Sequence, residues 1–193
     1  MLPSGTHEDA GGFLVAELNF EIRRQGLPYS IPRNCMLKPL APRSGYLPDI
    51  AVIDRNKLRD ELLWQKSSVI QNGATVPLVI EIVSTNWRDG AYPKGLASRR
   101  ERRKQVPATA PHDYGHKFVE YEAMGIAEYW IVDYRALGAV RYIGKPKQPT
   151  VTVCKLIDNE YQMEKHVESD RILSAIFPNL ELTTEAILNS VLQ

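Results

Sequence analysis

The sequence predicts an α/β (α+β) protein, and three observations indicate this fold class. Apolar residues recur at helical spacing in 8–24 and again in 113–124. Two segments rich in β-branched and aromatic residues, 76–83 and 127–134, have the composition of buried strands. Beyond residue 138, short strand-like segments follow one another closely, which is typical of an antiparallel meander.

Each expected element has its own local signal. Gly26 and Gly125 follow the two helical patterns and are suited to end them, because glycine favours the left-handed conformation after a helix. The remaining expectations are extended chain over 29–39, a strand over 46–54, a short helical turn within 56–64, meander strands at 139–144, 150–158 and 160–168, a hairpin turn at 158–160, and a last helix over 183–191 with Thr183 or Thr184 as its N-cap.

Length and composition fit a single globular domain spanning 1–193. The chain has 193 residues, 44% of them hydrophobic and 24% charged, and a net charge of +1. The first residues show no basic and apolar signal pattern, and no apolar run approaches the roughly 18 residues of a membrane span. Two isolated cysteines, Cys35 and Cys154, suit reduced thiols. These features predict a cytoplasmic protein without a membrane partner.

Charge is concentrated in one segment. Between Lys94 and Lys104 six basic residues stand against one glutamate, a local balance of +5. The surrounding stretch 90–112 contains three prolines and no hydrophobic period, which indicates an inserted loop. Its basic side chains are candidate contacts to DNA phosphates, and the alternative is a solvated, flexible loop. The candidates are Arg99, Arg100, Arg102, Arg103 and Lys104.

One glutamate lies within a predicted buried strand. Glu81 lies in the middle of the apolar run "VPLVIEIV", where an ionised group is costly unless it is paired or binds a metal. Asp49 precedes the strand "IAVI", and if the two strands are neighbours both carboxylates converge at one end of the sheet. Converging carboxylates repel unless a cation lies between them, and oxygen ligands favour Mg²⁺ or Mn²⁺.

The helix over 113–124 supplies further candidates. Lys117 is one turn after Asp113 and one turn before Tyr121, so the three share a face. A lysine beside a carboxylate site can orient water and offset charge on a phosphate. Each residue also has a simpler interpretation: a Pro-Asp turn at Asp49, an arginine pair for Glu81, and a solvated helix face for Lys117.

Three motifs in order carry a family resemblance. The segments "LPDIAVID", "PLVIEIVSTNW" and "DYGHKFVEYEAMGIAEYWIVD" together resemble the Uma-type family of restriction-endonuclease-like proteins, which belongs to the PD-(D/E)XK nuclease superfamily. The resemblance implies a restriction-endonuclease-like mixed β-sheet flanked by helices, with an αβββαβ core. It also implies a DNA endonuclease that depends on Mg²⁺ or Mn²⁺ and forms a homodimer.

The resemblance also assigns roles to residues. Asp49 and Glu81 would be the two metal-binding acids, with the backbone carbonyl of Ile82 as a further ligand. Val83 stands where the superfamily pattern has lysine, and Lys117 of the following helix would supply that group.

Several assignments stay open at this point. Glu17 on the first helix and Asp113 are possible further site acids, and Asp89 is an alternative to Asp113. Tyr129 and Trp130 are expected to pack in the core and at a dimer surface. The histidines of the N-terminal and helical segments have no partner at zinc-ligand spacing, so surface or capping roles are expected for them. They are His7, His112 and His116.

The stretch 90–112 departs from the family pattern. Removing it joins "STNWRD" to "YGHKFVEYE" through Asp113 as an uninterrupted family segment, so the insertion falls between Glu81 and Lys117. If the loop displaces the helix, cleavage fails. The rival hypothesis is therefore a catalytically inactive, dimeric member that binds nucleic acid or a protein partner.

Overall fold

The protein folds around a six-stranded mixed sheet. In the computed structural model, residues 4–39, 45–83 and 112–191 are described. The strand order is β1-β3-β5-β6-β7-β8, and a separate parallel pair joins β2 and β4. The strands are β1 (Tyr29–Ser30), β2 (Met36–Leu37), β3 (Ile50–Asp54), β4 (Val69–Ile70), β5 (Leu78–Ile82), β6 (Glu128–Asp133), β7 (Thr150–Ile157) and β8 (Glu160–Val167).

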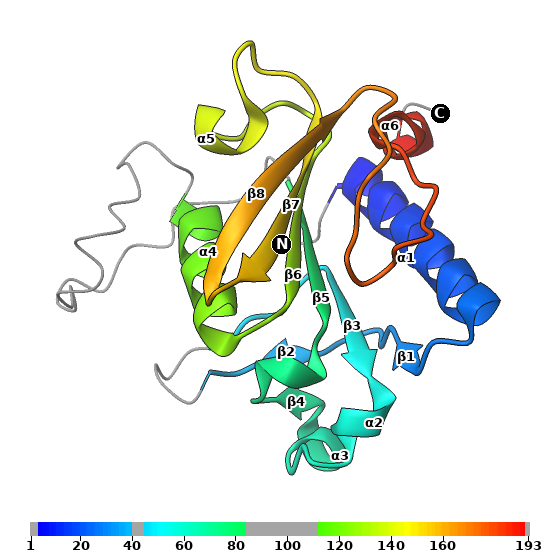
Figure 1. Ribbon diagram of the computed structural model, residues 1–193, viewed down its shortest axis with the longest axis vertical. Helices are drawn as coiled ribbons and strands as arrows, with labels where there is room; N and C mark the ends of the chain where they lie inside the picture. The colour runs from blue at the N-terminus through cyan, green and yellow to red at the C-terminus, as the bar shows by residue number, and fades with distance from the viewer. Residues whose placement is uncertain (1–3, 40–44, 84–111, 192–193) are drawn as a thin grey trace, which may run out of the picture.

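Helices cover both faces of this sheet (Figure 1). On one side lie α1 and α6, which pack against each other, and on the other side lies α4. The predicted α/β architecture, a mixed sheet between helices, is confirmed. The helices are α1 (Gly5–Gln25), α2 (Arg55–Leu58), α3 (Trp64–Ser67), α4 (His112–Met124), α5 (Val140–Ile143) and α6 (Thr184–Val191), with a short 3₁₀ turn, η1, at Gly73–Thr75.

The central strands run in both directions. β5 is antiparallel to β3 and parallel to β6, so the chain crosses back between β5 and β6 through α4. β6, β7 and β8 form the predicted antiparallel meander. Asp158 and Asn159 form its last turn, both with positive φ (51° and 62°), as a tight two-residue hairpin loop requires.

The prediction of a strand over 139–144 is wrong. Val140–Ile143 forms the single helical turn α5, which ends at Gly144 with φ 80°. Tyr142 and Ile143 are both buried in the core on the α4 side of the sheet. Adjacent residues of a strand would point to opposite faces, so only a turn lets these two neighbours enter one core.

Capping residues define both ends of α1, the long helix on the face of the sheet opposite α4. The Ser4 hydroxyl accepts a hydrogen bond from the backbone N–H of His7 at the start of α1, and Gly26 (φ 64°) ends it in the left-handed conformation. At α6, Thr183 Oγ1 accepts from Ala186 N, which is the predicted capping role for Thr183. Within the described ranges, no helix combines the length and the apolar character needed to cross a membrane.

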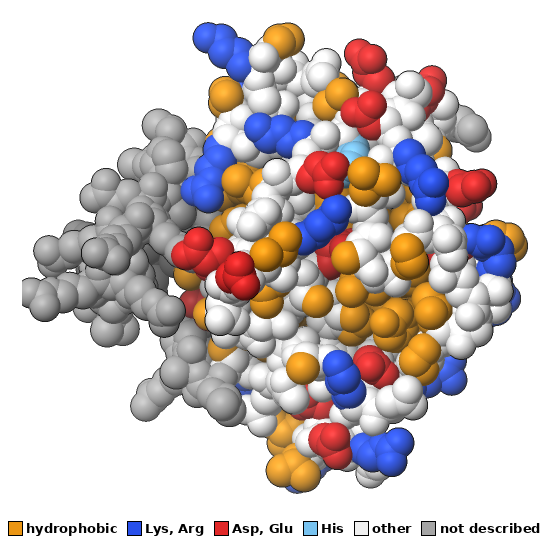
Figure 2. Space-filling model, in the orientation of Figure 1, with side chains coloured by type: hydrophobic (Ala, Val, Ile, Leu, Met, Phe, Trp, Pro, Cys, Tyr) orange, Lys and Arg blue, Asp and Glu red, His pale blue; other side chains and the backbone are white. Residues whose placement is uncertain are grey.

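Alternation along β5 divides the core into two layers. Leu78, Ile80 and Ile82 belong to the layer beneath α1, whereas Val79 and Val83 belong to the layer beneath α4. By this alternation Glu81 points to the α4 side. On the face shown in Figure 2, basic and acidic side chains are interspersed, so neither sign dominates there.

Candidate active site

Glu81 is held by two side chains of α4. Its side chain is 5% exposed, and Lys117 Nζ donates to Oε2 at 2.9 Å. Tyr121 Oη donates to Oε1 at 2.7 Å. Lys117 and Tyr121 are one helical turn apart, so α4 presents both toward the same carboxylate. Glu81 is therefore paired with a lysine, and no arginine of the described ranges pairs with it.

Asp49 lies across the strand gap from Glu81. Ile50 pairs with Ile80 in the antiparallel β3–β5 ladder, which places Asp49 opposite Glu81 by continuation of the register. Asp49 Oδ2 accepts a 2.7 Å hydrogen bond from the backbone N–H of Ile82. The Asp49 side chain is 28% exposed. The two carboxylates thus meet at one end of the sheet, and the site opens to solvent on the Asp49 side.

Burial makes Glu81 a weak acid in this setting. The pKa of Glu81 is raised from 4.5 to about 7: removal from water is the main cause and the nearby Asp49 carboxylate adds to it, whereas Lys117 and Tyr121 act in the opposite direction. The protein therefore stabilises the ionised form only in part. A cation placed between the two carboxylates would remove their repulsion and favour the ionised form.

The raised pKa predicts an inverse dependence of stability on pH. Between pH 4.5 and 7 the folded chain keeps a proton on Glu81 that the unfolded chain has lost, so the free energy of unfolding falls as pH rises. The loss is at most about 3 kcal/mol, at 1.36 kcal/mol per pKa unit. Urea unfolding at pH 5 and pH 8 in metal-free buffer measures it, with Glu81→Gln as the control that lacks this component. Equal pH slopes for the two proteins would contradict the prediction.

A residue missed by the sequence analysis completes the site. His7 is 7% exposed, and its Nε2 lies 3.3 Å from Asp49 Oδ2. The expected surface or capping role for His7 is therefore wrong for its side chain, because the first turn of α1 lies against the end of the sheet. The contact with Asp49 is the main cause of a raised pKa for His7, and burial opposes it. A signal existed: His7, Ala10, Leu14 and Leu18 share one helical face.

Comparison with known proteins identifies the family of this chain. Residues 1–97 and 105–185 match the family model Uma2, described as "Putative restriction endonuclease". The chain belongs to the Uma2 family. A crystal structure described as a putative nuclease of DUF820 from Anabaena variabilis is similar, with a TM-score of 0.63 and 15% identity over 100% of this chain and 85% of that chain. That likeness supports the fold. The search of curated proteins found no match.

The Uma2 match leaves out part of the predicted insertion at 90–112. Its two matched ranges leave out residues 98–104, which contain all five basic candidates from Arg99 to Lys104. Those five residues and Asp89 lie outside the described part of the structure. The same holds for the side chains of Asp113, His112 and His116, although all three positions belong to the first turns of α4.

Other sequence-predicted residues are placed as follows. Val83 is buried in the apolar layer beneath α4, so the lysine that reaches Glu81 comes from the helix. The N–H and C=O of one strand residue point to the same neighbouring strand, so the Ile82 carbonyl faces the gap toward Asp49. Glu17 lies ten residues beyond His7, about 15 Å along α1, and it makes no hydrogen bond or ion pair with the residues that the structure describes.

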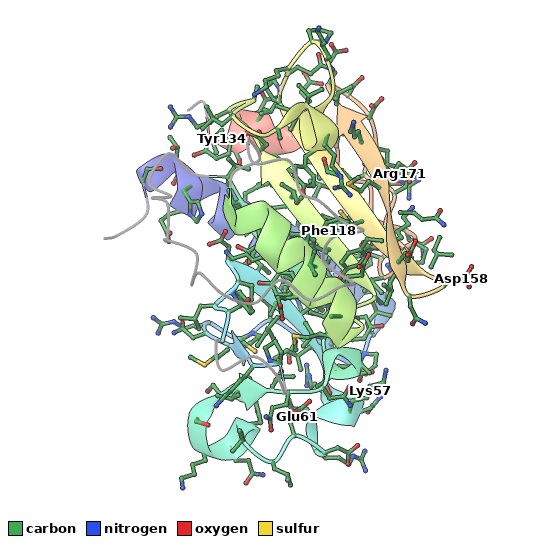
Figure 3. All side chains as sticks on the ribbon, turned by 90° about the vertical axis from the view of Figure 1, so that its left-hand side faces the viewer. Lys57, Glu61, Phe118, Tyr134, Asp158 and Arg171 are labelled. Carbon is green, nitrogen blue, oxygen red and sulfur yellow. The ribbon has the colours of Figure 1, made fainter. Side chains whose placement is uncertain are left out.

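Tyr129 and Trp130 do not form a dimer surface. Both side chains are fully buried, on opposite faces of β6. Phe118, labelled on α4 in Figure 3, contacts Tyr161 of β8 edge to face with 5.2 Å between the ring centroids, which helps to hold the helix over the sheet. The expected core position is confirmed for both residues. The dimer expectation loses the support that these aromatic residues gave it.

The donors in this Uma2 member suit a hard cation. Within the described residues, no group of three or more His, Cys, Asp or Glu side chains is arranged to hold a metal ion. Two carboxylates nevertheless lie close together here, and Mg²⁺ commonly uses one or two protein carboxylates and completes its coordination with water and phosphate. The repulsion between Asp49 and Glu81 is the physical feature that such an ion would relieve.

Proposed function

We propose that this chain is a divalent-metal-dependent endonuclease that hydrolyses DNA phosphodiester bonds. The observation that carries the proposal is Glu81, a carboxylate buried in β5 that faces Asp49 and is held by Lys117. Family membership and the nuclease description of the similar crystal structure support the same class of reaction.

The proposed roles follow from the positions of the donors. Asp49, Glu81 and the Ile82 carbonyl would hold Mg²⁺ or Mn²⁺. When bound, such an ion polarises a phosphoryl oxygen and stabilises the charge that develops on it. Lys117 would contribute a second positive charge on the α4 side and would orient an attacking water by donating a hydrogen bond from its ammonium to the water oxygen. Tyr121 fixes the Glu81 carboxylate by its 2.7 Å hydrogen bond.

The substrate would approach from the Asp49 side. Asp49 is the partly exposed member of the pair, whereas Glu81 is enclosed beneath α4. A phosphodiester reaching this edge meets the carboxylate pair first and the Lys117 ammonium behind it. Exclusion of water around Glu81 strengthens the interaction of each charge with the developing phosphate charge.

Asp49→Asn tests the proposal directly. Because the amide removes one anionic ligand, Mn²⁺ binding measured by calorimetry should weaken, and nicking of supercoiled plasmid with Mn²⁺ should fall at least about 100-fold. Asp54→Asn is the matched control at the other end of β3. Asp54 caps α2 through a hydrogen bond from Asn56 N, and asparagine caps equally well, so binding and cleavage should stay unchanged.

The opposite outcome would favour the rival function. A non-catalytic binding module would show DNA binding that weakens steeply with salt, no requirement for Mn²⁺, and no difference between the Asp49→Asn and Asp54→Asn variants. Wild-type Mn²⁺ affinity in the Asp49→Asn variant would overturn the proposed metal site.

A further inference from the structure

His7 makes a contact that the proposed reaction does not yet use. It is enclosed at the start of α1, and its Nε2 lies 3.3 Å from Asp49 Oδ2. Its other ring nitrogen, Nδ1, is buried without a hydrogen bond and lies 3.4 Å from Glu8 Oε1. The imidazole is therefore directed at Asp49 through Nε2, and Glu8 on the outer side is 67% exposed.

Two nitrogen atoms approach the same oxygen of Asp49. The backbone N–H of Ile82 in β5 donates to Oδ2 at 2.7 Å, and Nε2 of His7 in α1 lies 3.3 Å from the same oxygen. In the described part of the chain, no hydrogen bond to Oδ1 is present. With Oδ2 occupied from both sides, the carboxylate cannot rotate freely, and Oδ1 is the oxygen left to face a ligand.

The start of α1 is itself fixed. Ser4 caps the helix through the His7 backbone N–H. The neighbouring Thr6 hydroxyl lies 3.1 Å from Tyr134 Oη, directly beyond β6; Tyr134 is labelled at that end of the sheet in Figure 3. At Gly11, one turn further along, an added Cβ would lie in ordinary van der Waals contact with Ile82 Cδ1 at 3.5 Å, so this turn of α1 lies against β5. His7 is thus carried on a helix end that is anchored to the same strands as the site.

We propose that His7 is a positioning residue that orients the Asp49 carboxylate toward the divalent cation. The inference rests on the proposed metal-dependent function and deepens it. His7 acts through Asp49, because its Nε2 is already directed at that carboxylate. Partners of this kind around metal ligands typically change metal affinity by about 10–100-fold when removed.

Calorimetric titration with MnCl₂ tests this without any cleavage readout. His7→Leu, which removes the donor and keeps an apolar side chain, should weaken Mn²⁺ binding by about 10–100-fold. His7→Gln places an amide N–H near the position of Nε2 and should recover most of the loss. Glu8→Gln is the matched control, since it changes the other contact of the imidazole and should leave Mn²⁺ affinity unchanged.

The outcomes separate this inference from the function on which it rests. Unchanged Mn²⁺ affinity in His7→Leu, or equal losses in His7→Leu and His7→Gln, would overturn the positioning role. If Asp49→Asn also binds Mn²⁺ like the wild type, the metal site itself is wrong. Should His7→Leu fail to fold, His7→Asn replaces it, because the shorter amide does not reach Asp49 and should show the same loss.

Discussion

Replacing Glu81 with glutamine is expected to reduce Mn²⁺-dependent DNA cleavage at least about 100-fold while the fold stays intact. The amide keeps the size of the side chain and can still accept the hydrogen bond from Tyr121. It carries no negative charge for a metal ion or for Lys117. Initial rates of plasmid nicking, measured with saturating Mn²⁺ alongside the far-ultraviolet circular dichroism spectrum, give both results.

Stability distinguishes loss of function from loss of structure. Because burial disfavours the ionised Glu81 carboxylate, Glu81→Gln should unfold at the same or a higher urea concentration than the wild type at pH 8. Glu164→Gln makes the same change on β8, where the side chain is 45% exposed and pairs with Lys155. That control should cleave normally. Wild-type cleavage by Glu81→Gln would remove Glu81 from the site.

The sequence predicts the central elements because their signals are local and strong. The apolar run of β5, the helical pattern of α4 with Gly125 after it, and the hairpin at 158–160 all occur in the structure at the expected places. The segment 139–144 was misassigned because Val140, Tyr142 and Ile143 favour strands in isolation. Its helical turn depends on packing beneath α4, which is a tertiary effect.

The residues of the candidate site also fall into two groups: those that local sequence patterns predict and those whose position depends on tertiary packing. Asp49 and Glu81 could be paired from the sequence because neighbouring strands bring their ends together, and Lys117 because helical spacing puts it on a face with Tyr121. His7 could not be assigned by motif, since a single histidine has no characteristic spacing. Its contact depends on how α1 docks against the sheet. Only the helical phase of Ala10, Leu14 and Leu18 indicated that His7 would be buried.

Glu128→Leu is expected to lower the free energy of unfolding by about 3–5 kcal/mol. Glu128 is fully buried at the start of β6. It accepts hydrogen bonds from Trp130 Nε1 (2.6 Å), Ser174 Oγ (2.6 Å) and Ala175 N (2.7 Å). Leucine would leave all three donors without an acceptor, each at a cost of about 1–3 kcal/mol, partly offset because the buried charge is removed. Urea unfolding of the variant measures the loss.

The comparison with Glu81 makes this prediction informative about function. Both residues are glutamates buried in adjacent strands, and burial raises the pKa of each. The donors to Glu128 are neutral and join β6 to the segment that covers the α1 side of the core, whereas Glu81 faces a second carboxylate and a lysine. Glu128 pairs with Leu78, three residues and about 10 Å from Glu81 along β5.

A structural role for Glu128 therefore predicts lost stability with cleavage retained in the molecules that remain folded. Glu160→Leu, the same substitution at an exposed position of β8, should change stability by no more than about 0.5 kcal/mol. A loss below about 1 kcal/mol for Glu128→Leu would show that its three hydrogen bonds contribute little. Lost cleavage in a fully folded Glu128→Leu protein would instead extend the site beyond the end of the sheet where Asp49 and Glu81 meet.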